Sequence, residues 1–152
     1  MVLGVVLGNL LLGLVSGIAA SMMYARLITA RKARELRKQF GHLEGTYEEF
    51  VRNATMAPSR TRGTITLRYT GGTGFTTEAV GGDGKTFWHG ELFMREDARI
   101  LGEGYYSHIG RDDTGLHHVI YNPTDGHFNV SGENTSHPNG VKDFKTIWRR
   151  KL

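Results

Sequence analysis

The chain of 152 residues contains no cysteine and only three prolines. The absence of cysteine excludes disulfides and thiolate metal sites, and it leaves the redox compartment open. Charged residues are also missing between Val2 and Ala25, where Leu, Val, Ile, Ala and Gly dominate. About 20 apolar residues are enough for a helix to cross the hydrocarbon core of a bilayer. We therefore expect one transmembrane helix in residues 1–28.

The positive charge of the chain is concentrated directly after this apolar stretch. Residues 1–39 carry six basic residues and one acidic residue, whereas the remainder carries 13 basic and 14 acidic residues. Because positive charge stays on the cytoplasmic side, we expect a single-pass protein of the inner (plasma) membrane, with its N-terminus outside and its C-terminal domain in the cytosol. Residues 29–41 would form a basic juxtamembrane stalk against the lipid bilayer. The nearly neutral domain argues against a nucleic acid polymer as partner.

A cleaved signal peptide is the alternative reading of the same segment. The small residues of Ser16–Ser21 offer a cleavage site, and cleavage would place the domain in the periplasm or outside the cell. Against this alternative, no basic residue precedes the apolar run, and the basic cluster follows it.

Small residues recur at four-residue spacing along the apolar run, and one polar residue accompanies them. The candidate self-association residues are Gly4, Gly8, Asn9, Gly13, Gly17 and Ser21. Small side chains let helix backbones approach closely, and two such stripes suit a helix with two neighbours, as in a ring or a filament. We therefore expect a homo-oligomer. The alternative is that glycine is simply common in transmembrane helices.

From Leu43 onward, short stretches rich in Thr, Tyr, Phe, Val and Ile are separated by Gly, Asn and Asp clusters that are typical of hairpin turns. The pattern predicts strands at 43–51, 62–70, 73–80, 85–95, 99–108, 115–122, 126–132 and 143–150. We predict that residues 42–152 form an all-β domain, a small eight-stranded antiparallel up-and-down β-barrel. Such a barrel encloses room for side chains or for one small ligand. Gly90, Gly102 and Gly104 would either relieve crowding at sharp curvature or leave space for a guest.

The residues that commonly carry catalysis show no catalytic pattern. Serines and acids are scattered without a nucleophile elbow or triad order, and His117 and His118 are adjacent on a predicted strand, so that they face opposite sides. We predict no enzyme activity, no cofactor and no metal site. The alternative is a metal site assembled from separate strands, such as His89, His108 and His118.

Two short motifs at the ends of the domain resemble the calycin (lipocalin-like) family. Gly45-Thr46-Tyr47 stands in the first predicted strand, with Tyr where lipocalins usually have Trp, and Trp148-Arg149-Arg150 closes the last one. In that family, a basic residue of the last strand packs over the aromatic residue of the first. The resemblance implies a minimal calycin-like barrel, and it makes a membrane-tethered carrier of an apolar ligand one alternative function.

The layout of the chain resembles a second family, the membrane-anchored β-barrel effectors of bacterial cyclic-oligonucleotide anti-phage (CBASS) systems. That family typically has two transmembrane helices, whereas this chain has one apolar segment. The resemblance implies that the barrel senses a cyclic oligonucleotide and that assembly of the helices perturbs the inner membrane in anti-phage defence. A purely structural assembly module is the other alternative.

An anionic cyclic nucleotide requires Arg groups for its phosphates and aromatic planes for its bases. Polar side chains would read the base edges. The candidate ligand-binding residues are Arg68, Tyr69, Trp88, Tyr106, His118, Asn129, Asn134 and Arg149. The alternative for each aromatic residue is a place in the core, and for each Arg a place on a solvated face.

Overall fold

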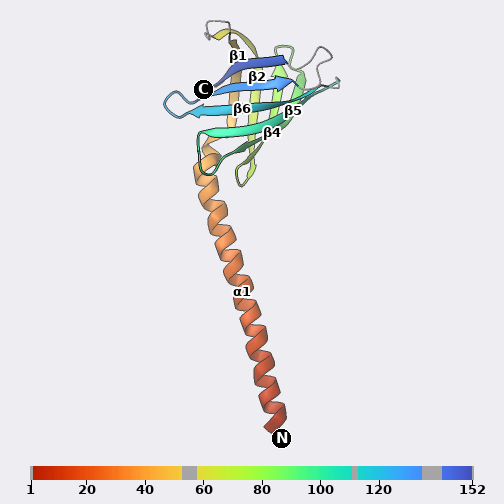
Figure 1. Ribbon diagram of the computed structural model, residues 1–152, viewed down its shortest axis with the longest axis vertical. Helices are drawn as coiled ribbons and strands as arrows, with labels where there is room; N and C mark the ends of the chain where they lie inside the picture. Colours follow the sequence, from red (N-terminus) through yellow and green to blue (C-terminus); the bar gives the residue numbers. More distant parts are fainter. Residues whose placement is uncertain (1, 53–57, 111–112, 135–141, 152) are drawn as a thin grey trace. The chain divides into compact units, whose positions relative to one another are not determined.

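The computed structural model describes residues 2–52, 58–110, 113–134 and 142–151, and of residues 2–16, 52, 58–61, 134, 142 and 143 it describes the backbone alone. The chain divides into two compact units, residues 1–35 and residues 36–152. The first unit is helical, and the second contains the strands (Figure 1).

Helix α1 runs from Val2 to Phe40, and the single turn of 3-10 helix η1 follows at Gly41–Leu43. The helix therefore continues from the uncharged segment through the basic run without a break. Its side chains are exposed from Gly17 to Glu35. The last turn belongs to the second unit, in which Phe40 is completely buried. Among the described residues, no helix is long and apolar enough to cross a membrane.

Eight antiparallel strands follow, and each pairs with the next in sequence. The strands are β1 (Gly45–Arg52), β2 (Pro58–Gly71), β3 (Gly74–Gly81), β4 (Thr86–Met94), β5 (Leu101–His108), β6 (Thr114–Asn122), β7 (His127–Asn134) and β8 (Lys142–Arg150). Strand β8 pairs with β1 and closes the sheet into a barrel (Figure 1). The prediction of an eight-stranded up-and-down antiparallel barrel is confirmed. Closure leaves no exposed sheet edge.

The up-and-down order gives the barrel two distinct ends. We call the end where β1 begins and β8 finishes the near end, because Phe40 and Leu43 pack into the same buried core there. The far end is where β1 finishes and β8 begins. Residues along each strand can therefore be placed by their distance from these two ends.

Alternation along the strands decides which side chains fill the interior. On β4, Trp88, Gly90, Leu92 and Met94 are buried, as their predicted shared face requires. A Cβ atom at Gly90 would collide with the carbonyl oxygen of Tyr105 on the neighbouring strand. Close approach of the strands, rather than space for a guest, therefore explains this glycine.

Inward-facing rings lie beside these glycines. Tyr106 is paired with Gly90 on one side and with Gly115 on the other, and His117 is paired with Gly104 and Gly132. The rings of Tyr106 and His117 stack at an interplanar angle of 10°, with centroids 6.1 Å apart. Aromatic rings thus cover backbone that glycine leaves bare, which is a recognised way to hold a curved sheet together.

Two polar side chains at the near end are hydrogen-bonded to backbone carbonyls. The Tyr47 hydroxyl donates to the Leu43 carbonyl at 2.7 Å, and the Arg150 guanidinium donates to the carbonyls of His42 and Glu44 at 2.8 and 2.7 Å. The guanidinium carbon of Arg150 lies 5.8 Å from the centre of the Tyr47 ring. These contacts tie the first strand, the last strand and the chain entering the barrel to one another.

Candidate functional site

The barrel interior contains polar side chains with no hydrogen-bond partner among the described residues. We call Glu49, His117, Thr146 and Trp148 the interior polar cluster. They come from β1, β6 and β8, and none is more than 3% exposed. Each has one buried nitrogen or oxygen atom without a hydrogen bond. Such atoms each cost roughly 1–3 kcal/mol of folding free energy, so that a group of four marks this region as unusual.

Glu49 is the acidic member of the cluster. It is paired with Trp148 in the β1–β8 ladder. Burial raises the pKa of Glu49 above its ordinary value. Arg62, Trp148 and Thr146 act in the opposite direction, and burial outweighs them. The Trp148 Nε1 and Thr146 Oγ1 groups interact with the carboxylate without reaching the geometry of an ordinary hydrogen bond. Glu49 is therefore a carboxyl group that protonates more readily than a solvated one.

His117 is the imidazole of the cluster. Its ring lies edge-on to Trp148, with centroids 5.7 Å apart. Burial, with a smaller contribution from His118, lowers the pKa of His117 to about 4. The ring is therefore neutral at physiological pH, and it has one nitrogen that can donate a hydrogen bond and one that can accept. His117 and His118 face opposite sides of β6, as predicted, because His118 has a 60% exposed side chain.

Arg62 links the cluster to solvent. Its side chain is 42% exposed, and its Nε atom lies 4.0 Å from Glu49 Oε2. Its guanidinium carbon also lies 5.6 Å from the centre of the Phe87 ring. Tyr106 is in the same region, since Arg62 and Glu49 both act on its pKa. Burial raises the pKa of Tyr106 to about 12 and Asp113 adds to this effect, so the hydroxyl keeps its proton. The arrangement therefore combines one cation at the surface with hydrogen-bonding groups below it.

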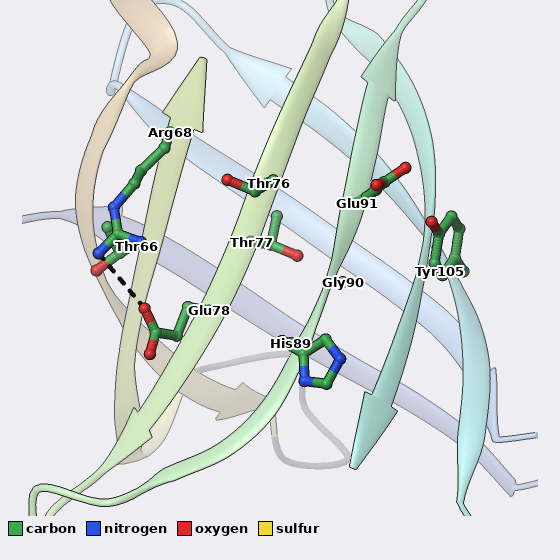
Figure 2. A pocket seen from close by; sticks show the side chains of 9 residues that line it. All are labelled: Thr66, Arg68, Thr76, Thr77, Glu78, His89, Gly90, Glu91 and Tyr105. Atoms are coloured by element: carbon green, nitrogen blue, oxygen red, sulfur yellow. Dashed lines mark ion pairs between the residues drawn. The ribbon is translucent and has the colours of Figure 1, made fainter. Parts of the chain in front are cut away.

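A second site lies on the outer surface of the barrel, and we call it the outer groove (Figure 2). Its volume is about 490 Å³, within the range of small-molecule pockets. The lining residues come from β2, β3, β4 and β5 and are Thr66, Arg68, Thr76, Thr77, Glu78, His89, Gly90, Glu91 and Tyr105. Within it, Arg68 Nη2 lies 3.5 Å from Glu78 Oε2, and the dashed line in Figure 2 marks this ion pair.

The structure distributes the candidate ligand-binding residues over several places. Trp88 and Tyr106 are buried side by side in the interior, with ring centroids 5.8 Å apart. Arg68 lies in the outer groove, paired with Glu78. Tyr69 lies toward the near end, where its hydroxyl donates to the Gly72 carbonyl at 2.8 Å.

The other four candidates lie on β6, β7 and β8. His118 Nδ1 is 4.0 Å from Glu103 Oε1 on the outer face. Asn129 is half-buried beside His127, and Arg149 is exposed, with its guanidinium carbon 5.3 Å from the centre of the Phe50 ring. The side chain of Asn134 lies outside the described residues. Only Trp88 and Tyr106 are thus brought into contact with the region of the interior polar cluster.

The metal-site alternative finds no support in the described part of the chain. No group of three or more His, Asp or Glu residues there has the geometry to hold a metal ion. His108 packs against Phe87, with the rings stacked at 6.2 Å, while His118 lies beside Glu103 on the outer face. The helix residues proposed for self-association are Gly4, Gly8, Asn9 and Gly13, whose side chains lie outside the described residues, and Gly17 and Ser21, which are exposed.

Sequence reasoning missed the interior polar cluster, although part of its signal was present. Tyr47, Glu49 and Val51 alternate with Glu48 and Phe50, so that the inward face of the first strand includes a carboxylate. A carboxylate on the apolar side of an amphipathic strand is uncommon, because burial penalises its charge. No protein-family model matches this chain, and no curated protein is similar to it in sequence, so that its function has to be argued from this geometry.

Proposed function

We propose that this protein is a single-pass inner-membrane sensor whose cytosolic barrel binds a small polar ligand, with a cyclic oligonucleotide as the leading ligand class, in anti-phage defence. Ligand binding shifts the N-terminal helices between dispersed and assembled states, and assembly perturbs the membrane. The uncharged run from Val2 to Ala25 and the basic run after it support the anchor and its orientation.

The observation that carries the sensor proposal is the interior polar cluster. A barrel that served only as a scaffold would gain stability by filling these positions with apolar side chains. Instead, four hydrogen-bonding atoms without a partner among the described residues lie in the barrel interior. A ligand that inserts a polar group at the far end would satisfy them. Binding would be favoured because each of these buried atoms would gain a hydrogen bond.

Arg62 and the aromatic rings support the choice of ligand class. Arg62 lies beside Glu49 of the cluster and offers guanidinium donors to a phosphate. Trp88 and Tyr106 supply planar surfaces below it. Protonation of Glu49 would remove the charge that repels an anion. Rearrangement of these packed rings would be the step that couples binding to assembly, since a ligand shifts an equilibrium only through its different affinity for the two states.

A structural assembly module is the second candidate, and the packed interior favours it. Trp88, Tyr106, His117 and Trp148 form a continuous group of rings with centroids 5.7–6.3 Å apart. These side chains occupy the space in which a carrier of an apolar ligand would hold its cargo, which makes the carrier the weaker alternative.

The ligand test uses the full-length chain in detergent. Cyclic dinucleotides are added, and the unfolding temperature and particle size are measured. The proposal expects a raised unfolding temperature and a larger particle with at least one of them, and weaker binding of that ligand by Arg62→Gln. Arg99→Gln, which changes an exposed arginine near the other end, is the matched control. Shifts absent with every cyclic dinucleotide would favour the structural module.

The membrane proposal has its own test, made simple by the absence of cysteine. Val2→Cys and Lys151→Cys are expressed separately in cells and treated with a membrane-impermeant maleimide. We expect residue 2 to react in intact cells and residue 151 to react only after permeabilisation. Mature protein that starts downstream of Ala20 would instead establish the signal peptide.

Replacing Gly13 and Gly17 with Leu should disrupt assembly.

A further inference from the structure

Strands β4 to β7 differ in charge from the other side of the barrel. Their sequences contain the glutamates Glu91, Glu103 and Glu133 and no lysine or arginine. Strands β8, β1 and β2 contain more basic than acidic residues. In the closed strand order, β5 is the fourth strand from β1 in either direction. The acidic and the basic strands therefore lie on opposite sides of the barrel.

The acidic side also exposes large apolar side chains. Tyr105 and Leu116 are 49% and 50% exposed and are paired in the β5–β6 ladder. The register continues this pair to Glu91 on one side and to Glu133 on the other, so that carboxylates flank the apolar pair. We call Glu91, Glu103, Tyr105, Leu116, Ile120 and Glu133 the acidic face. Exposed apolar side chains with polar groups around them are typical of a protein interface.

The charge of the acidic face restricts what can cover it. Histidine is the only residue type of β4 to β7 that can carry a positive charge, and His118 Nδ1 lies 4.0 Å from Glu103 Oε1. Two acidic faces placed against each other would bring carboxylates together, and an anionic lipid surface would be repelled in the same way. A suitable partner therefore offers positive charge together with apolar surface.

The opposite side of the barrel has both properties. On β8, Lys145 and Arg149 are exposed and alternate with side chains that are buried in the interior. Phe50 on β1 is half-buried, and the guanidinium carbon of Arg149 lies 5.3 Å from the centre of its ring. Glu48 is paired with Arg149 in the β1–β8 ladder and offsets part of this charge. We call Phe50, Lys145 and Arg149 the basic face.

We propose that the acidic face of one copy of this chain binds the basic face of a second copy. The lysine and arginine would pair with glutamates, and Phe50 would pack against the Tyr105–Leu116 pair. Because the two faces differ and lie on opposite sides, each contact leaves one face of each barrel free, and repetition generates a ring or a filament. The interface goes beyond the proposed function, since it requires neither a nucleotide nor the small residues of helix α1.

The absence of cysteine allows this contact to be mapped by cross-linking. Full-length chains with Leu116→Cys and with Lys145→Cys are mixed in detergent without nucleotide and treated with a short bis-maleimide. We expect a cross-linked dimer from the mixture and little from either variant alone, because different faces meet. Thr76→Cys, which is exposed on β3 between the two faces, replaces Leu116→Cys as the matched control and should give only the background of random encounters.

Charge reversal tests whether opposite charges hold the two faces together. Glu103→Lys with Glu133→Lys, both placed in the Leu116→Cys chain, should lower the yield of the dimer roughly fivefold. Arg149→Glu in the Lys145→Cys chain should then restore most of the yield, because the facing charges are again opposite. All of these substitutions are at exposed positions, and thermal unfolding checks that each variant is folded.

Three results would overturn the proposal. A dimer yield equal to that of the Thr76→Cys control, or unchanged by charge reversal, would show that the two faces do not recognise each other. Dimers from Leu116→Cys alone would show that the acidic face binds itself. A cross-link from Leu116→Cys to Ala33→Cys, with none to Lys145→Cys, would place the basic stalk of a second copy on the acidic face. Failure to bind cyclic dinucleotides would affect none of these measurements, so that the two proposals can fail separately.

Discussion

The near end of the barrel and the interior polar cluster differ in whether their polar groups are hydrogen-bonded. At the near end, the Tyr47 hydroxyl and the Arg150 guanidinium are bonded to backbone carbonyls, and Phe40 and Leu43 fill the remaining space. Farther along the interior, the four members of the interior polar cluster each have an atom with no hydrogen bond to the described residues. The barrel thus has one region in which hydrogen-bonded polar groups stabilise the fold and another in which unpaired polar groups lower the free energy of unfolding. Functional sites commonly contain such unpaired groups, because a group positioned for a ligand has no hydrogen-bond partner when the ligand is absent.

The largest expected effect concerns the apolar packing of the near end. Phe40→Ala should lower the free energy of unfolding by roughly 3–5 kcal/mol, because it removes a completely buried ring and leaves a cavity. Denaturant unfolding of the full-length chain in detergent measures the change. Phe93→Ala is the control, since Phe93 is 46% exposed on the outer face. Equal losses in the two variants would show that the near end is not the stabilising region.

The pH dependence of stability should come from the interior polar cluster. The pKa of His117 is about 4 in the folded chain and 6.5 in its ordinary state. The unfolded chain therefore takes up a proton before the folded one does, and stability present above pH 6.5 is lost as the pH falls toward 4. The size is on the order of 3 kcal/mol. Unfolding measured from pH 7 to pH 4 should lose this dependence in His117→Leu.

Glu49 should act in the opposite direction over part of the same range. Its folded pKa is raised, so the folded chain holds a proton that the unfolded chain releases, and stability falls as the pH rises through that raised value. Glu49→Gln should therefore be more stable than the natural chain at pH 7, and its acid sensitivity should increase because only the His117 effect remains. If neither His117→Leu nor Glu49→Gln changed the pH dependence of stability, the proposed contribution of the interior polar cluster would be contradicted.

A smaller effect is expected from the arginine at the near end. Arg150→Gln loses two charged hydrogen bonds to backbone carbonyls and the contact with the Tyr47 ring. We expect a loss of about 1–2 kcal/mol, detected as a lower denaturant midpoint. Arg149→Gln, on the neighbouring exposed position, should cost less, since Arg149 contacts the Phe50 ring on the outer face.

The smallest and sharpest test deletes one hydroxyl group from the near end and one from the interior polar cluster. Tyr47→Phe removes the hydrogen bond to the Leu43 carbonyl and should destabilise the chain by about 1 kcal/mol. Thr146→Val removes a buried hydroxyl whose interaction with Glu49 falls short of an ordinary hydrogen bond, and it should be neutral or stabilising by up to about 1 kcal/mol. Opposite signs in parallel thermal unfolding would support the comparison, and a loss in both variants would contradict it.

Most of the barrel could be predicted because its signals are local. The alternation of Ile65 and Leu67 with Thr64 and Thr66 matches the buried and outward faces of β2. The turn glycines Gly72, Gly84 and Gly126 have positive φ angles of 58°, 75° and 63°, a conformation that glycine adopts without strain. The main difference is the start of β2, which lies at Pro58 instead of residue 62. Its first residues have no apolar alternation, and pairing with β1 recruits them into the sheet.

The candidate site was far less predictable. The sequence predicts Arg68 as a phosphate ligand, yet Glu78 on the adjacent strand pairs with it. It predicts Tyr69 as a base-stacking residue, yet the Tyr69 ring packs against Phe75, with centroids 5.4 Å apart. In both cases the decisive neighbour comes from a different strand, and its position depends on register. Side-chain type alone does not reveal whether a charge is already compensated.

The sequence by itself determined the strand pattern, the turns, the uncharged N-terminal segment and the charge asymmetry, because each of these follows from residues close together in the chain. Only the tertiary structure decided that β8 closes on β1 and places Trp148 beside Glu49, that Phe40 fills the near end, and that Gly90 lies where a Cβ atom would collide with the Tyr105 carbonyl oxygen. These features depend on contacts between residues up to about a hundred positions apart. Hydrogen-bond satisfaction and burial are properties of such contacts, and they arise when the barrel closes.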